Sequence, residues 1–166
     1  MDSTDAILDN HPMMKRLIKS LSSIPLFSTL SSEELKNLAK YMFFLDYQEG
    51  DVVFKEGDKG SYMCFLIEGS LSVSTRSKGE GDTELSIIEK GRPVGEMAVI
   101  DDFPRSATVR AKTNSRLLTL SRKNFESLLE NHPETGIKVL KGIARLVCIN
   151  LRRTSVELAD LKTPVI

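Results

Sequence analysis

The feature that most constrains the fold is a series of short apolar runs between residues 43 and 120, each ended by a glycine-containing break. The runs are VVF, SYMCFLI, LSVST, LSII, ATVRA and LLTL, and the breaks are EGD (49–51), EGD (56–58), EGS (68–70), GEGD (79–82) and KGR (90–92). Strands of this length, with a turn every ten residues or so, are typical of an all-β sandwich or barrel. The periodicity alone does not choose between the two.

Short amphipathic helices precede this region. Met14, Leu17, Ile18 and Leu21 recur at helical spacing, and Ser31 followed by Glu34 has the form of a capping box. We therefore expect a helical segment over residues 1–23 and a β-domain over residues 24–132.

A long helix is predicted after the β-domain, over residues 133–166 including a short tail. Ser121 can cap a short helix that begins with RKNFESLLE, and Pro133 then starts the long helix. Steps of three and four residues define a coiled-coil seam, of which all members except Thr154 are apolar or alanine: Ile137, Leu140, Ala144, Val147, Leu151, Thr154, Leu158 and Leu161. A second apolar line, Val139, Ile143 and Leu146, can dock on the β-domain. We expect a parallel homodimer through the seam; the alternative is one helix that packs a wide stripe on its own domain.

Composition limits the possible functions. Lys plus Arg equals Asp plus Glu at 23 each, so no overall field favours nucleic acid or an anionic membrane. The two histidines, His11 and His132, lie outside the strand region and cannot assemble the histidine-rich metal centre of a jelly-roll enzyme. No catalytic triad is evident either. Cys64 and Cys148 are expected to be buried, reduced thiols, and a loose basic group (Arg110, Lys112, Arg116, Arg122 and Lys123) is expected to be a solvated face.

The stretch GEMAVIDDFPRSATVRAKT, residues 95–113, places two charges in apolar surroundings. Glu96 accepts hydrogen bonds, which suits sugar hydroxyls, and the planar guanidinium of Arg105 suits a phosphate. The small residues Gly95 and Ala98 allow backbone amides to approach an anion, and Ser106 adds a hydroxyl. A ribose phosphate fits these groups; the alternative is that Glu96 and Arg105 form an internal ion pair.

The run GEMAVIDDFPRSATVRA resembles the phosphate-binding cassette of the cyclic nucleotide-binding domain family, which includes catabolite activator proteins, regulatory subunits of cyclic AMP-dependent kinase and cyclic nucleotide-gated channels. The likeness extends upstream through EGDVVFKEGDKGSYMCFLIEGSLSV, covers residues 24–132, and includes a following helix. It implies a mainly β fold, a double-stranded β-roll of jelly-roll type, with N-terminal helices and a long C-terminal helix. Val94 and Cys64 occupy positions that are often aromatic in the family.

The resemblance also implies residue roles. Glu96 would accept from the ribose 2′-hydroxyl, Arg105 would bind the cyclic phosphate, and Val109 with other apolar residues would line the space near the base, under the long helix. The backbone amides of Gly95, Met97, Ala98 and Ala107, together with the Ser106 hydroxyl, would complete the anion shell. Asp101 and Asp102 lie near the expected phosphate, either at a solvent-facing tip or in a position that weakens the site.

These features predict a cytoplasmic sensor of a cyclic purine nucleotide that is not an enzyme, needs no cofactor, and signals through helix movement to an unidentified effector protein. Cyclic AMP is favoured over cyclic GMP, because Ser106 is neutral between them and no guanine-specific group is evident. We expect no membrane contact and no DNA binding, since only five residues follow Leu161. A nucleotide-independent dimeric interaction module with the same fold is the alternative.

Overall fold

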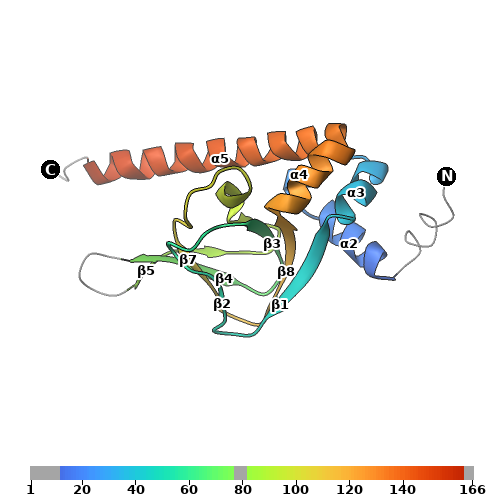
Figure 1. Ribbon diagram of the computed structural model, residues 1–166. Coiled ribbons are helices and arrows are strands. Elements are labelled where there is room, and N and C mark those ends of the chain that lie inside the picture. The colour runs from blue at the N-terminus through green and yellow to red at the C-terminus, as the bar shows by residue number, and fades with distance from the viewer. Residues whose placement is uncertain (1–11, 77–81, 163–166) are drawn as a thin grey trace.

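The computed structural model describes residues 12–76 and 82–162, and within them the fold is built on eight antiparallel strands in two four-stranded sheets (Figure 1). The first sheet has the order β1-β8-β3-β6 and the second the order β2-β7-β4-β5. The strands are β1 Met42–Tyr47, β2 Val52–Phe54, β3 Tyr62–Glu68, β4 Leu71–Arg76, β5 Asp82–Ile88, β6 Pro93–Val94, β7 Thr108–Ala111 and β8 Ser115–Ser121. The mainly β architecture with flanking helices is thereby confirmed.

The central strands β3 and β8 of the first sheet are buried on both faces, which explains why β3 reads as a continuous apolar run. Successive side chains of a strand point to opposite faces. Met63 and Phe65 accordingly join the core beneath the helices, whereas Cys64 and Leu66 join the core between the two sheets. The outer strand β5 is exposed along most of its length, because it forms the edge of the second sheet.

The helices before and after the strands cover one face of the first sheet. They are α2 Pro12–Ser22, the short 3₁₀ helix η1 Pro25–Phe27, α3 Ser32–Ala39, α4 Arg122–Asn131 and α5 Pro133–Lys162. The Ser31 capping box is present, with Ser31 Oγ accepting from the Glu34 amide and the Glu34 carboxylate accepting from the Ser31 amide. Ser121 caps α4 as expected. Of the predicted N-terminal segment, residues 1–11 lie outside the described part.

Helix α5 runs across the whole molecule and has two different faces (Figure 1). Val139 and Ile143 are buried against the domain, as the second apolar line predicts. The seam residues Ile137, Leu140, Ala144, Val147, Leu151 and Leu158 are exposed. The side chain of Leu161 lies outside the described part. The structure thus leaves the seam open along the described helix, and its use in a dimer stays a prediction.

One prediction about the thiols is wrong. Cys64 is buried, whereas Cys148 is exposed on α5. The run RLVCIN is apolar around Cys148, but only the part of it that faces the domain is covered. No helix in the described ranges is both long and apolar enough to cross a lipid bilayer.

Candidate functional site

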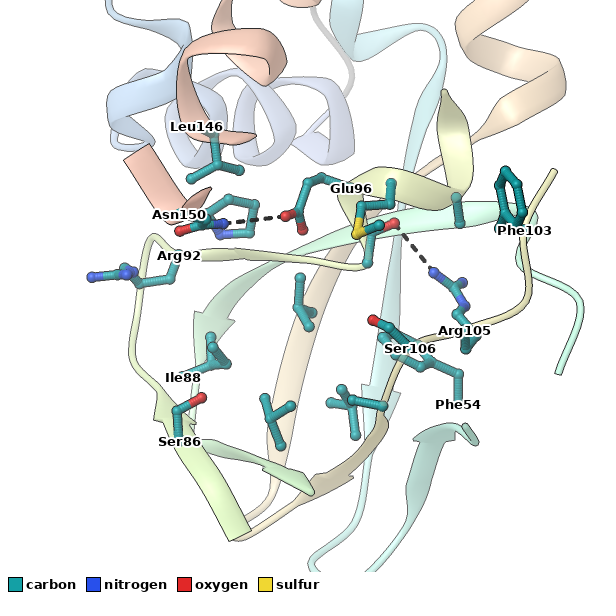
Figure 2. A pocket seen from close by; sticks show the side chains of 18 of the residues that line it. Phe54, Ser86, Ile88, Arg92, Glu96, Phe103, Arg105, Ser106, Leu146 and Asn150 are labelled. Carbon is teal, nitrogen blue, oxygen red and sulfur yellow. Dashed lines mark hydrogen bonds between the residues drawn. The ribbon is translucent and has the colours of Figure 1, made fainter. Parts of the chain in front are cut away.

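A cavity of about 190 Å³ lies between the second sheet, the turn around η2 (Glu96–Val99) and α5 (Figure 2). Every residue that the sequence suggested for ligand binding lines it: Gly95, Glu96, Met97, Ala98, Arg105, Ser106, Ala107 and Val109. The structure therefore brings the candidate residues together around one space. That they bind a ligand remains a prediction.

Gly95 is what allows the chain to turn from β6 into η2. Its φ is +74°, in the left-handed region that side chains with a Cβ rarely adopt. A Cβ here would also lie 2.5 Å from Arg105 Nη1 and 3.2 Å from the ring of Phe54. The glycine thus serves both the turn and the close approach of the arginine.

Arg105 is a buried cation with no carboxylate partner among the described residues. Its Nη2 donates to the Tyr62 carbonyl at 2.7 Å and its Nη1 to the Gly95 carbonyl at 3.2 Å. The guanidinium carbon lies 3.9 Å from the ring centroid of Phe54 and 4.7 Å from that of Tyr62. Nε is buried and has no hydrogen-bond partner within residues 12–76 and 82–162. Burial lowers the pKa of Arg105 from its usual range, which means that keeping the buried guanidinium charged costs free energy.

Glu96 points toward α5 and not toward Arg105 (Figure 2). Its Oε1 accepts a hydrogen bond from Asn150 Nδ2 at 3.3 Å. No ion pair joins Glu96 to Arg105, although both lie in the described part of the chain. The acceptor and the cation are therefore held apart at the edge of one cavity, and the internal ion pair considered from the sequence is not what the structure shows.

Several residues that line the cavity were not predicted from the motif around Glu96 and Arg105. Phe54 is one, and its stacking on Arg105 depends on how β2 is placed. Leu146, Asn150 and Arg153 are others, contributed by α5. Leu146 is the last member of the second apolar line, and Asn150 and Arg153 continue that face at steps of four and three residues. That spacing predicts one face of the helix, but which turns of the face reach the cavity depends on where α5 crosses the sheet.

Arg122 corrects the expectation of a solvated basic face. Its Nε and Nη2 donate to the Ala98 carbonyl at 3.0 and 2.6 Å, and Nη2 also donates to the Asp101 carbonyl. Its Nη1 forms an ion pair with Asp102, which is thereby neutralised at an exposed tip. The Asp101 carboxylate accepts from the Phe103 amide at 3.3 Å. A basic residue in a strand-to-helix connection can thus be held by backbone carbonyls, which composition does not reveal.

The site geometry agrees with a family comparison. The family model described as "Cyclic nucleotide-binding domain" matches residues 44–132, more than half of the chain. This chain belongs to the cyclic nucleotide-binding domain family.

Individual relatives and a solved structure show how similar this chain is to other members of the family. It is 37% identical over 66% of its length to a cAMP-dependent protein kinase regulatory subunit of Debaryomyces hansenii, and 27% identical over 85% of its length to a CRP-like cAMP-activated global transcriptional regulator of Mycobacterium tuberculosis. It spans 23% and 61% of those two proteins. A crystal structure of a cyclic nucleotide-binding domain from Methylobacillus flagellatus superposes with a TM-score of 0.79 and 27% identity, covering 92% of this chain and 86% of that one. The expected β-roll fold is thereby confirmed.

Proposed function

We propose that this chain is a cytoplasmic cyclic nucleotide sensor, a binding module with no chemistry of its own. The observation that carries the proposal is the buried Arg105, incompletely paired and separated from Glu96 across a cavity. In this assignment Arg105 binds the cyclic phosphate and Glu96 accepts from the ribose 2′-hydroxyl. The backbone amides of Gly95, Met97, Ala98 and Ala107, with the Ser106 hydroxyl, complete the anion shell, and Val109 lines the space near the base.

The size of the cavity supports a signalling role for α5. Ligand pockets usually enclose about 300–1,000 Å³, whereas this cavity has about 190 Å³ and α5 lies over one side of it. We therefore expect a purine nucleotide to displace α5 and, with it, Asn150. Glu96 can accept from the ribose through Oε2, because the hydrogen bond from Asn150 occupies Oε1. Ligand binding would then be coupled to the position of α5, because the nucleotide would bind more tightly when α5 is displaced than when α5 lies over the cavity.

The preference for cyclic AMP over cyclic GMP is part of the proposal and is supported by Asn150. Because Nδ2 of Asn150 donates to Glu96, its Oδ1 remains available as an acceptor at the helix side of the cavity. Adenine offers an exocyclic amine donor where guanine offers a carbonyl acceptor. Where this acceptor meets position 6 of the bound base, it favours adenine, because guanine carries its exocyclic amine at position 2.

Calorimetric titration of the purified chain with cyclic AMP and cyclic GMP tests the proposal directly. We expect saturable binding of both, tighter for cyclic AMP. Absence of heat with either nucleotide at millimolar concentration would refute the sensor function, and tighter binding of cyclic GMP would refute only the base preference.

We also propose that two copies associate through the exposed seam of α5, and that the output passes to an effector protein by direct contact. Support comes from the row Ile137, Leu140, Val147, Leu151 and Leu158, all at least 38% exposed. A row of exposed apolar side chains at coiled-coil spacing favours a partner helix with the same pattern.

A nucleotide-independent dimeric interaction module is the second candidate. It is favoured by the small cavity and by the hydrogen bond that already occupies Glu96. Thermal melts with and without nucleotide separate the two functions, because a ligand that binds only the folded state raises the melting temperature. No shift at saturating nucleotide would favour the interaction module.

A further inference from the structure

Arg122 does not line the cavity, yet it holds the turn that does. It is the first residue of α4, and its guanidinium contacts carbonyls at the end of η2 and just after it. Four of its contacts reach backbone or side-chain oxygens of residues 98–102, and a fifth, longer contact of 3.4 Å reaches the Gly60 carbonyl. A single side chain thus connects α4, η2 and the loop before β3.

The residues whose carbonyls Arg122 contacts pack directly against Arg105. A Cβ at Gly60 would lie 2.5 Å from the Ala98 Cβ and 3.3 Å from Arg105 Nε. Gly60, Ala98 and Arg105 are therefore in close contact, and Arg122 holds the first two by their carbonyls. Close-packed groups of this kind transmit displacement, because little space exists to absorb it.

Arg122 also removes two features that would disfavour a bound anion. It pairs with the Asp102 carboxylate, which reduces the negative charge beside the turn. By accepting from Arg122, the carbonyls of Ala98 and Asp101 gain a cationic donor at the end of η2, where backbone carbonyls lack partners within the helix. The partners of its three nitrogens are all protein oxygens, and of its five N–H groups one, on Nη1, is not used in these contacts among the described residues.

We propose that Arg122 is a positioning residue for nucleotide binding, which fixes the turn of residues 95–101 against Arg105 without touching the ligand. The consequence for binding rests on the proposed sensor function, whereas the effect on the turn does not. A planar guanidinium suits this role, because its three nitrogens together reach two carbonyls and a carboxylate, whereas an ammonium group carries its three donors on a single nitrogen.

The test compares Arg122→Gln, Arg122→Lys and a matched control, Arg116→Gln. Arg116 binds the Asp46 carboxylate with two hydrogen bonds, of 2.6 and 3.0 Å, at a distant place between β8 and β1. Amide hydrogen exchange is followed first in the ligand-free protein, at Ile100 and Asp101, whose amides donate to the Met97 carbonyl. Cyclic AMP affinity is then measured by calorimetry.

We expect Arg122→Gln to speed exchange at Ile100 and Asp101 by about tenfold or more and to weaken cyclic AMP binding by at least about tenfold, since hydrogen bonds to a charged group are among the stronger ones. Arg116→Gln should leave both quantities unchanged. Arg122→Lys should recover only part of the loss; because it retains the charge, it also serves if Arg122→Gln fails to fold.

Three results would overturn the inference. These are unchanged exchange in Arg122→Gln, full recovery by Arg122→Lys, or a loss of affinity that Arg116→Gln reproduces. If the wild-type chain binds neither cyclic nucleotide, the sensor function fails, and exchange in the ligand-free variants still decides whether Arg122 holds the turn.

Discussion

Replacing Arg105 by alanine is the perturbation that distinguishes a ligand site from a structural arginine. In the ligand-free protein the guanidinium makes two hydrogen bonds to carbonyls and stacks on Phe54, but its Nε is buried without a partner. Arg105→Ala therefore removes a desolvated cation and at the same time leaves the Tyr62 and Gly95 carbonyls without their donor. Because these effects oppose one another, we expect the free energy of unfolding to change by only about 1–2 kcal/mol.

The effect on binding should be larger. Breaking a buried, hydrogen-bonded charge pair by removing one partner typically costs about 3–5 kcal/mol. At about 1.4 kcal/mol per factor of ten, cyclic AMP affinity should fall by roughly two to three and a half orders of magnitude. The lower end of this range is expected if water enters the cavity and the amides of η2 with Ser106 still bind the phosphate.

Calorimetry and chemical unfolding of the same preparations measure the two quantities. Arg110→Ala is the matched control, since Arg110 lies on β7 close to Arg105 in sequence but is exposed, and its guanidinium donates to the Gly50 carbonyl at 2.5 Å. We expect nearly unchanged affinity in the control. Equal affinity in Arg105→Ala and the wild-type chain, or an equal loss in both variants, would refute the reasoning.

Three further predictions follow from backbone geometry, from the exposed seam and from burial. Gly95→Ala should reduce both the stability and the cyclic AMP affinity, whereas Gly50→Ala should reduce only the stability, by about 1–2 kcal/mol. The backbone φ is positive at both positions, but of the two glycines only Gly95 lies against Arg105 and Phe54. Similar affinities in both variants would contradict this. Leu151→Arg should convert a dimer to a monomer in sedimentation experiments, and a wild-type chain that is already monomeric at high concentration would exclude the seam. Burial raises the pKa of Cys64 to about 11, so a thiol reagent at pH 8 should label one cysteine of the native chain, Cys148, and two after denaturation; rapid labelling of both in the native state would show that the core opens.

Local sequence chemistry was sufficient for most of the secondary structure. The capping residues Ser31 and Ser121 define helix starts through contacts within three residues, and the positive φ of Gly95 is required by the turn it occupies. The motif around Glu96 and Arg105 likewise placed every candidate residue on the cavity wall, because those residues lie on one continuous segment that leads from β6 into β7, where Val109 lies.

The errors concern contacts between segments far apart in the chain. The exposure of Cys148 and the contacts of Arg122 with residues 98–102 depend on which surface each side chain meets after folding, and charge or hydropathy does not encode this. The stacking of Phe54 on Arg105 joins residues 51 positions apart and depends on how β2 pairs with β7.

The sequence by itself determined that this chain forms a β-domain between helices and that one turn carries an acceptor and a cation. These properties arise from hydrogen bonding and side-chain periodicity over a few residues. Only the tertiary structure decided that Glu96 meets Asn150 of α5, that Arg105 keeps a buried nitrogen without a partner among the described residues, and that Arg122 contacts residues 98–102. Such contacts depend on the packing of distant elements, in which each partner is set by the positions of all the others.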